Sequence, residues 1–404
     1  MLTDKPKILI YSHDSFGLGH LRRCRAIAHA LVGQISELSV LILSGSPIIG
    51  SFDFRARVDF VRIPGVIKLR NGEYTSLNLH IDIEHTLAIR SSIIEHTAQV
   101  YNPDIFIVDK EPTGLRGEVL PTLETLKAAG TRLVLGLRDV MDDPETLREE
   151  WERKNVTPAL TDLYDEIWIY GQPSIHDPLA GLGLPESVRS KTLYTGYLRR
   201  DLPRAQRPME NFHFSDDPFI LVTPGGGGDG EELIDWVLRA YEAQRAPLLP
   251  ALIVLGPFMA PEAQAQFMAR AEALDNIHII DFTPQIEPYL DRAAAVVGMG
   301  GYNTFCEILS FDKPTLLVPR IEPRREQAIR ANRAEANGLA NVLPIDSYPN
   351  TDLMTDALAA LPIASPPSAA GLDGLLDGLT VINDRVQQIL SGAVDEEEAK
   401  RALG

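Results

Sequence analysis

A chain of 404 residues, 45% of them hydrophobic and 23% charged, is long enough for two globular domains, and this composition excludes a disordered chain. The net charge of −18 argues against a general nucleic-acid-binding protein, because phosphate backbones are held by clustered Lys and Arg. Only two cysteines are present, Cys24 and Cys306, so no disulfide framework is expected, as is typical of the reducing cytosol.

The beginning of the chain, MLTDKPK, runs directly into the strand-like KILIYS, without the apolar core of a signal peptide. No apolar stretch approaches the roughly 20 residues that a helix needs to cross a bilayer. These features predict a soluble, cytoplasmic protein. A local basic patch can still hold an acidic protein at a membrane surface, so peripheral contact at the inner face of the membrane stays open.

The first half of the chain alternates short apolar runs with amphipathic segments, the pattern of βα units wound into a parallel sheet. The strands expected here are 7–12, 38–44, 58–62, 104–108, 131–137 and 165–170. The helices expected between them include 20–32, 83–100 and 115–129. The Pro- and Arg-rich segment from Tyr197 to Pro208 has no apolar periodicity and is interpreted as a linker.

After the linker the alternation starts again. It predicts strands at 218–223, 250–255, 277–280, 294–297 and 314–318, with helices at 230–243 and 261–273. A helical pattern returns at 372–391, before an acidic, solvated tail. The fold class is therefore α/β, with two Rossmann-like domains facing across a cleft and ligands expected at the carboxyl ends of the strands. The expected divisions are 1–198, a linker at 199–210, 211–370, and a C-terminal helix with its tail at 371–404.

The first predicted strand opens into a glycine-containing turn, Ser12 to His20, followed by a helix. Gly17 and Gly19 allow the backbone to turn tightly and approach a ligand, and the helix N-terminus presents free N–H groups. His13 lies in the same turn and is expected to contact the substrate. A glycine-rich turn with His20 beside a helix cap is the plain structural alternative.

Four consecutive glycines follow the first strand after the linker and precede a helix: Gly225, Gly226, Gly227 and Gly228. Their backbone N–H groups could cradle a diphosphate. The run GGGGDG also satisfies G-x-G-x-x-G, so an NAD site has to be weighed. The next strand, ALIVLGP, ends without the carboxylate that such a site places about 20 residues further on, and no Gly-Lys-Ser/Thr follows as in a P-loop. The sequence therefore favours a diphosphate site without NAD.

Two further strand ends in the second half carry glycines and polar side chains. The residues concerned are Gly300, Gly301, Thr304, Glu307, Glu326 and Gln327. A carboxylate two turns into a helix, such as Glu307, can accept two hydrogen bonds from a ribose diol, although most Glu residues are simply solvated. Glu326 and Gln327 combine an acceptor with an amide and could hold sugar hydroxyls. Because adjacent βα loops meet at one edge of a sheet, we expect these loops to form one site.

The segment AAAVVGMGGYNTFCEILSFDKPTLLVP resembles the donor-site signature of glycosyltransferase family 28, whose best-known member adds N-acetylglucosamine to the lipid-linked peptidoglycan precursor. The resemblance runs in order over much of the chain and is densest from Ile277 to Val342. It implies the GT-B fold, with domain 1–198 on the acceptor side and domain 211–370 binding the nucleotide-sugar donor. The linker start TGYLRR resembles the interdomain TGxxxR segment of the family.

Carried over by position, the resemblance implies a role for each donor-side residue. Gly225 to Gly228 would form the diphosphate loop, and Gly301 and Thr304 would line the phosphate end. Glu307 matches the residue that holds the ribose. Glu326 and Gln327 match the pair near the sugar.

The resemblance also covers the uracil site and the acceptor side. Phe282, after the strand IHII, matches the position whose backbone contacts uracil. Gly17, Gly19 and His20 match a G-x-G-H element, and Asp139 lies in the segment LRD, where the family places an acceptor-site loop. Residues 45–100 have no clear counterpart, so the acceptor is not identified.

Enzymes of this kind invert the anomeric centre as an acceptor hydroxyl displaces UDP. No Asp-x-Asp element occurs at a strand end, so neither a metal nor a cofactor is expected, and helix N-termini would stabilise the leaving UDP. His20 is the first candidate for the base, since an imidazole with a pKa of about 6.5 suits proton transfer. His13, Asp109 and Asp139 also lie at strand ends facing the cleft, and Asp109 could equally cap a loop.

The expected function is transfer of a hexose or N-acetylhexosamine from a UDP-sugar to a glycan or lipid-linked acceptor, in cell-envelope or polysaccharide biosynthesis. The element GLGHLRRC also resembles a related UDP-sugar hydrolase, in which the Gly-His pair activates water. A non-catalytic nucleotide-sugar-binding protein is the third alternative. Arg22, Arg23 and Arg25 are interpreted as a solvated helix face, with attraction of an anionic acceptor or membrane lipid as the alternative.

Overall fold

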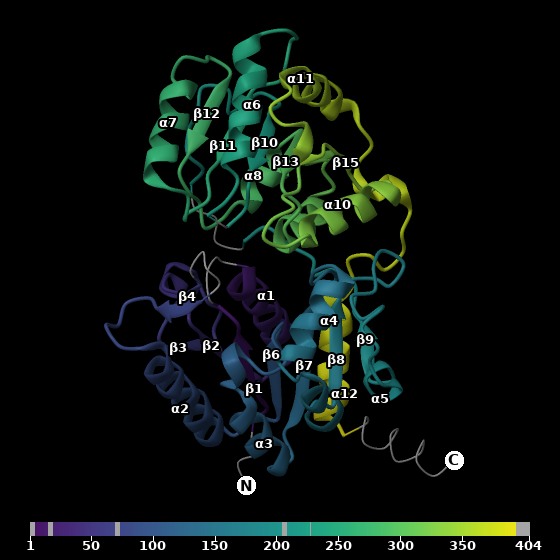
Figure 1. Ribbon diagram of the computed structural model, residues 1–404. Helices are drawn as coiled ribbons and strands as arrows, with labels where there is room; N and C mark the ends of the chain where they lie inside the picture. The colour runs from purple at the N-terminus through teal and green to yellow at the C-terminus, as the bar shows by residue number, and fades with distance from the viewer. Residues whose placement is uncertain (1–4, 15–18, 69–72, 204–207, 227, 393–404) are drawn as a thin grey trace.

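The computed structural model describes residues 5–14, 19–68, 73–203, 208–226 and 228–392. These residues form two α/β domains, each built on its own parallel sheet, and the domains face each other across the carboxyl ends of their strands (Figure 1). The α/β class and the two-domain arrangement expected from the repeated βα pattern are confirmed. None of the described helices is both long and apolar enough to cross a membrane.

The N-terminal domain is built on a seven-stranded sheet. In spatial order its strands are β3 (Val58–Arg62), β2 (Ser39–Ser44), β1 (Lys7–Ser12), β6 (Ile105–Asp109), β7 (Arg132–Arg138), β8 (Glu166–Tyr170) and β9 (Thr192–Tyr194). Its helices are α1 (Gly19–Gln34), α2 (Ile83–Tyr101), α3 (Leu120–Ala128), α4 (Pro144–Arg153) and α5 (Glu186–Arg189). A separate hairpin joins β4 (Val66–Lys68) and β5 (Tyr74–Ser76).

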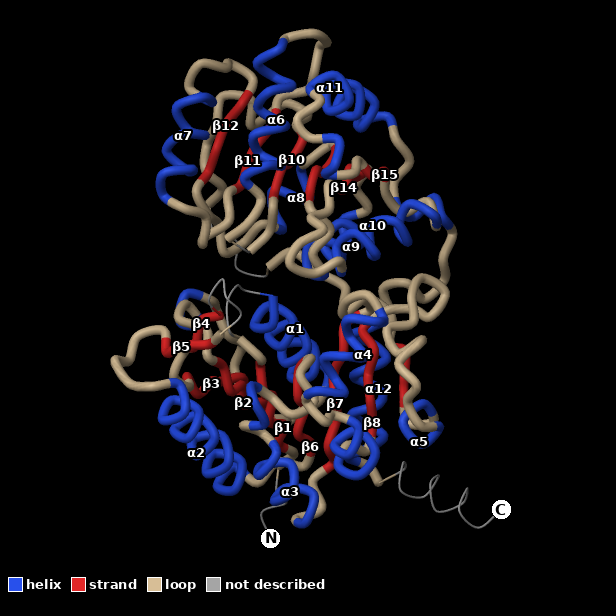
Figure 2. Tube along the Cα trace, viewed as in Figure 1, coloured by secondary structure: helices blue, strands red, loops and turns tan. Residues whose placement is uncertain are grey.

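Both faces of this sheet are covered, which explains why its central strands are largely apolar. Along β1, Ile8 and Ile10 pack into one buried cluster with α1, while Leu9 and Tyr11 pack into another with α2 and α3. Figure 2 shows the strands enclosed between helices in this way. Helix α1 buries an apolar stripe at helical spacing that includes Cys24.

The C-terminal domain is built on a six-stranded sheet. In spatial order its strands are β12 (Ile277–Ile280), β11 (Ala251–Val254), β10 (Ile220–Thr223), β13 (Ala295–Gly298), β14 (Thr315–Leu317) and β15 (Asn341–Val342). Its helices are α6 (Glu231–Ala243), α7 (Pro261–Ala271), α8 (Glu287–Arg292), α9 (Tyr302–Phe311), α10 (Glu326–Ala336) and α11 (Thr351–Ala360).

The structure contains elements that the sequence pattern did not predict. The strands of the β4–β5 hairpin have three residues each, too few to show an alternation. Helix α4 is mostly charged, and its only local signals are Asp143, which caps the first turn, and Pro144. Helix α3 begins at Leu120 instead of residue 115, because the preceding Gly114 and Gly117 have φ values of 69° and 87° that a helix cannot contain.

The helix expected at 372–391 begins later than the pattern suggested. Helix α12 (Gly378–Leu390) returns to the N-terminal domain, where it packs against α1 beside β8 (Figure 1). Arg385 donates from Nε to Glu166 Oε2 on β8 at 2.9 Å. The backbone N–H of Tyr197 donates to the carbonyl of Leu375 at 2.8 Å, so the two segments that connect the domains are joined to each other.

The contact between the domains has an aromatic and an ionic part. Tyr197 of the linker lies edge-to-face on Phe305 of α9, with ring centroids 5.2 Å apart. Arg330 of α10 donates from Nε and Nη2 to the two carboxylate oxygens of Asp139, which follows β7, at 2.9 and 2.7 Å. The hydroxyl of Tyr197 donates to the same carboxylate at 3.0 Å. Asp139 and Arg330 are both fully buried, so this ion pair is part of the domain interface.

Candidate functional site

Each sheet reverses its strand order at one point, and the candidate residues gather at these two points. The reversal lies between β1 and β6 in the N-terminal sheet and between β10 and β13 in the C-terminal sheet. Loops that leave neighbouring strands in opposite directions open a crevice, which is where α/β proteins bind ligands. His13 follows β1 and Asp109 ends β6, while glycine-bearing loops follow β10 and β13.

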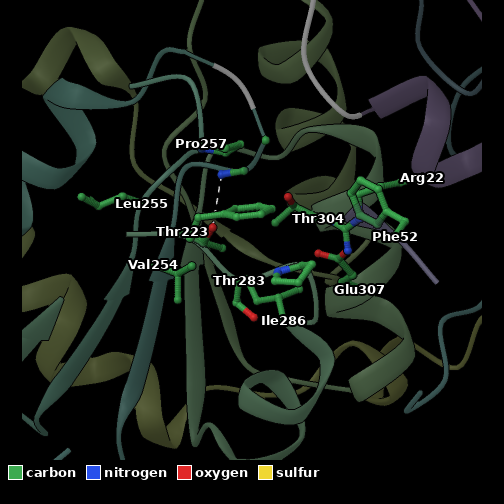
Figure 3. Close-up of a pocket in the computed structure, with 14 residues that line it drawn as sticks. Arg22, Phe52, Thr223, Val254, Leu255, Pro257, Thr283, Ile286, Thr304 and Glu307 are labelled. Carbon is green, nitrogen blue, oxygen red and sulfur yellow. Dashed lines mark hydrogen bonds and ion pairs between the residues drawn. The ribbon is translucent and has the colours of Figure 1, made fainter. Parts of the chain in front are cut away.

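A pocket opens at the C-terminal reversal point, and we call it the C-terminal pocket (Figure 3). It is lined by Arg22, Phe52, Thr223, Gly225, Gly226, Val254, Leu255, Pro257, Phe282, Thr283, Pro284, Ile286, Thr304 and Glu307. Five of the predicted binding residues are therefore brought together here: Gly225, Gly226, Phe282, Thr304 and Glu307. Arg22 and Phe52 belong to the N-terminal domain, so the facing domain closes one side of the pocket.

The loop after β10 approaches α9 closely. Gly225 has a φ of 95°, and a Cβ added there would lie 3.4 Å from Thr304 Oγ1. Its N–H donates to Thr223 Oγ1 at 3.2 Å. A side chain would therefore fill the space between this loop and α9, which is where a diphosphate was expected. Gly228 lines a neighbouring cavity instead, and Gly227 lies outside the described residues.

The loop after β13 ends in the N-terminus of α9. Gly301 directly precedes the helix and has no side chain to satisfy the first free N–H groups, so these remain for a ligand. Gly300 has a φ of 79°, and its carbonyl accepts a hydrogen bond from Arg330 Nη1 at 2.8 Å. Thr304 lies in the first turn of α9 and lines the pocket. The α9 N-terminus thus combines a positive dipole end with a hydroxyl.

Glu307 is buried, with an exposed fraction of 1%, and forms an ion pair with Arg22 of the opposite domain. Figure 3 shows the two side chains pointing toward each other at the edge of the pocket. Burial raises the pKa of Glu307, and the Arg22 guanidinium acts against this effect. Arg22 also lies 3.4 Å from Glu287 Oε1. The carboxylate expected to hold a ribose is therefore occupied by an arginine in this structure.

Aromatic side chains from both domains meet at the same pocket. Phe282, in the loop after β12, and Phe258 both pack against the buried cluster of Leu21, Ile49 and Phe52 in the N-terminal domain. Phe282 and Phe52 both line the pocket. These side chains give the pocket apolar walls, of the kind that a planar base can pack against. The contact of the Phe282 backbone with uracil stays a prediction.

A second group of predicted residues meets at the N-terminal reversal point. His20 Nδ1 lies 2.5 Å from Asp109 Oδ2. Arg23 donates from Nε and Nη2 to the two oxygens of Asp109, at 2.7 and 2.6 Å. The ring of His13 lies edge-on to that of His20, with centroids 5.7 Å apart, and Tyr11 Oη lies 3.1 Å from His13 Nδ1. Two imidazoles and one carboxylate thus form a compact cluster.

The ionisation of this cluster follows from burial and from Arg23. Burial opposes the charge on Asp109, but Arg23 and His20 outweigh it and hold the pKa of Asp109 well below its usual range. Burial lowers the pKa of His20 to about 4, although Asp109 acts to raise it. His20 is therefore neutral at pH 7. Since the Asp109 carboxylate can only accept a hydrogen bond, His20 carries its proton on Nδ1 and Nε2 has a free lone pair.

Asp139 does not join this cluster, because Arg330 and Tyr197 occupy its carboxylate in the domain interface. We interpret Asp139 as a structural residue in place of the acid–base role considered from the sequence. Asp109, with both oxygens held, is better described as a residue that positions His20.

Glu326 and Gln327 also lie outside the lining of the C-terminal pocket. Glu326 Oε2 accepts a hydrogen bond from Arg138 Nη2 of the N-terminal domain at 2.5 Å. Burial opposes its charge, but Arg138 and other arginines outweigh burial and lower the pKa of Glu326 to about 2. Gln327 Oε1 accepts from the backbone N–H of Arg320 at 3.2 Å. Their contact with a donor sugar stays a prediction.

The remaining sequence-predicted residues belong to the turn after β1. Gly19 begins α1, and its carbonyl accepts a hydrogen bond from Asn303 Nδ2 of α9 at 3.0 Å. The start of α1 therefore touches the start of α9 across the two domains. Gly17 lies outside the described residues.

Arg22, Arg23 and Arg25 are not the solvated helix face that the sequence suggested. Arg23 is 1% exposed and holds Asp109, while Arg22 reaches Glu307 of the other domain. The signal was present for Arg23, since positions 23, 27 and 31 share one face of a helix and the latter two are Ile27 and Leu31. The role of Arg22 had no such signal, because its partner lies in the other domain.

Comparisons with known proteins agree with this architecture. The family described as "Glycosyltransferase family 28 C-terminal domain" matches residues 219–360. An uncharacterised glycosyltransferase of Methanosarcina acetivorans is 25% identical over 368 residues, which cover 86% of this chain and 88% of the relative.

Solved structures share the fold at low identity. A UGT transferase from Siraitia grosvenorii in complex with UDP has a TM-score of 0.62 at 12% identity, covering 96% of this chain and 100% of that one. The glycosyltransferase VinC in complex with dTDP has a TM-score of 0.60 at 16% identity, with the same coverage. The resemblance to family 28 is confirmed by the family match, and the GT-B fold by these structures. The chain thus has the GT-B fold, and its C-terminal domain matches glycosyltransferase family 28 over residues 219–360.

Proposed function

We propose that this chain is an inverting glycosyltransferase that takes a hexose or N-acetylhexosamine from a UDP-sugar and transfers it to a hydroxyl of a glycan or lipid-linked acceptor. One observation carries the proposal: a buried carboxylate, Glu307, and glycine-bearing loops line one pocket. The pair of His20 and Asp109 lies at the facing reversal point. The UDP present in the Siraitia grosvenorii structure supports a nucleoside diphosphate donor.

In the proposed reaction, the acceptor oxygen bonds to the anomeric carbon as the bond between that carbon and the UDP oxygen breaks. The proton of the acceptor hydroxyl passes to Nε2 of His20, whose Nδ1 is held by Asp109. The negative charge on the leaving UDP meets the N–H groups at the start of α9 and along Gly225 and Gly226. Preorganised donors of this kind typically contribute about 3–4 kcal/mol each.

UDP-sugar hydrolysis is a second candidate, and the geometry of His20 favours it to the same degree. A neutral imidazole held by a carboxylate can take a proton from water as readily as from a sugar hydroxyl. UDP release from a panel of UDP-sugars, with and without glycan and lipid-linked acceptors, separates the two. A transferase releases UDP quickly only with its acceptor, whereas a hydrolase does so in buffer alone. Tight UDP binding with no turnover in any mixture would instead indicate a non-catalytic nucleotide-sugar-binding protein.

UDP is expected to bind without a divalent metal. The groups proposed to meet the diphosphate are backbone N–H donors at a helix N-terminus, which carry their own positive potential. Among the residues that the structure describes, no three His, Cys, Asp or Glu side chains are grouped to hold a metal ion. Calorimetric titrations of UDP in EDTA and in magnesium should give similar affinities. A strict magnesium requirement would contradict this account of diphosphate binding.

Glu307→Gln is expected to weaken UDP binding by about 1.5–3 kcal/mol, the usual contribution of a hydrogen bond to a charged group. The binding of 2′,3′-dideoxy-UDP should change little, because that ligand has no diol for Glu307 to hold. Glu287→Gln is the matched control, since Glu287 also lies beside Arg22 but outside the pocket lining. Equal losses for both ligands, or an equal effect of the control, would show that Glu307 acts only through Arg22.

A further inference from the structure

A second groove lies beside the C-terminal pocket, where α1, the linker and the C-terminal domain meet. It has a volume of about 170 Å³. We call it the arginine groove, after the five arginines in its lining: Arg22, Arg25, Arg55, Arg199 and Arg200. The first three come from the N-terminal domain and the last two from the linker. Glu287 and Gln285 contribute the side that belongs to the C-terminal domain.

The arginine groove is positive in a protein that is strongly negative. Its five arginines are opposed by three carboxylates, Asp201 and Glu287 in the lining and Glu307 as the partner of Arg22, whereas the whole chain has a net charge of −18. Burial lowers the pKa of His29 in the same lining to about 3, and Arg25 and Arg55 act in the same direction. A concave surface of one sign concentrates its field and attracts ions of the opposite sign.

Arg200 lines this groove, and its guanidinium group is only partly hydrogen-bonded. Its side chain is buried, with a residue exposure of 8%, and Nη2 donates to Asn303 Oδ1 at 2.9 Å. The Nη1 group is buried and has no hydrogen-bond partner among the described residues. Leaving a buried charged donor unpaired is costly, so an anion at this place would stabilise it. Beside it, the side chain of Arg199 is 59% exposed and lies 3.9 Å from Asp201, so it can turn into the groove.

We propose that the arginine groove binds a phosphate-bearing anion, held jointly by the linker and both domains. One guanidinium group can donate two parallel hydrogen bonds to two oxygens of a phosphate. Several arginines in one groove are therefore suited to binding a phosphate group. A volume of about 170 Å³ has room for a phosphate or diphosphate group. The site is distinct from the C-terminal pocket, with which it shares Arg22.

Calorimetric titration of inorganic pyrophosphate into the full chain at physiological salt tests the proposal. We expect the double variant Arg55→Gln/Arg199→Gln to bind pyrophosphate at least about tenfold more weakly than the unaltered chain, because two charged donors are lost. Both residues are exposed, so the melting temperature should be unchanged. Arg148→Gln, on the exposed side of α4, is the control for loss of charge alone and should bind as the unaltered chain does.

A parallel titration at saturating UDP separates the groove from the diphosphate loops of the C-terminal pocket. Pyrophosphate binding that UDP abolishes and the double variant leaves intact would overturn the proposal, as would the absence of any binding. Sedimentation with phosphatidylglycerol–phosphatidylcholine vesicles distinguishes the source of the phosphate. If the chain binds vesicles, and both added pyrophosphate and the double variant reduce this binding, the ligand is a lipid headgroup. If it binds pyrophosphate but no vesicles, the ligand is a soluble phosphate compound.

Discussion

The substitution His20→Asn is expected to lower turnover by roughly 10²–10⁴-fold, the usual contribution of general-base catalysis. His20 donates from Nδ1 to Asp109 and keeps a lone pair on Nε2. Asparagine can still donate to Asp109, but it cannot take up a proton. UDP affinity should hardly change, because twelve of the fourteen residues that line the C-terminal pocket belong to the C-terminal domain.

Steady-state UDP release per folded molecule measures the effect, and His96→Asn is the matched control. His96 is exposed on α2, away from both reversal points, so its replacement should leave turnover unchanged. If His20→Asn instead lowered the melting temperature and left turnover per folded molecule intact, His20 would be a structural residue of the α1 turn. Asp109→Asn should also lower turnover, because a neutral amide does not stabilise the imidazolium that forms when His20 takes up a proton.

The pH dependence of the rate tests the role of His20 further, because a purely structural role would not affect it. Because burial lowers the pKa of His20 to about 4, the rate should hold between pH 7 and 5 and fall only as pH approaches 4. If the pKa of His20 were the usual value of about 6.5, the enzyme would lose activity below that pH.

The stability of the fold should change over the pH range between these two pKa values. The unfolded chain takes up this proton first as pH falls, so the contribution of neutral His20 is complete above about 6.5 and is lost between there and pH 4.

The sequence predicted those site residues whose signal lies within one strand and the loop that follows it. Glycines and a carboxylate after a buried strand are local signals, and their strands neighbour each other once the sheet order is fixed by parallel winding. Gly225, Thr304 and Glu307 therefore meet as expected in one pocket. His20 and Asp109 meet for the same reason, since β1 and β6 are adjacent.

The contacts between the two domains could not be predicted in this way. Two ion pairs join residues that are far apart in the chain, Arg22 with Glu307 and Asp139 with Arg330. No periodicity within one helix or strand determines how two domains face each other. The same limit applies to α12. The sequence shows its helical pattern, but its packing against α1 depends on the path of the segment that precedes it. A charged residue at a strand end therefore has two structural outcomes, ligand contact or domain contact, which the sequence alone does not separate.

The substitution Asp139→Ala is expected to lower the free energy of unfolding by about 3–5 kcal/mol, because it leaves Arg330 charged and buried without its partner. The carbonyl of Gly300 would still accept from Arg330 Nη1, but Arg330 Nε and Nη2 would lose their hydrogen bonds to the carboxylate. The hydroxyl of Tyr197 would lose its hydrogen bond to Asp139 as well. The double variant Asp139→Leu/Arg330→Met should recover much of the loss, since replacing a buried ion pair by apolar side chains is often close to neutral.

Urea unfolding followed by circular dichroism measures these changes, with the exposed pair of Arg245 and Asp352 as the matched control. Removing Asp352 takes away the same charge from a surface ion pair, which should move the midpoint little. The transition of Asp139→Ala should also broaden or split, because the buried pair couples the unfolding of the two domains. An unchanged midpoint together with a large loss of turnover would reverse the assignment, since Asp139 would then act on the substrate and the interface would be held by the aromatic contact of Tyr197 and Phe305.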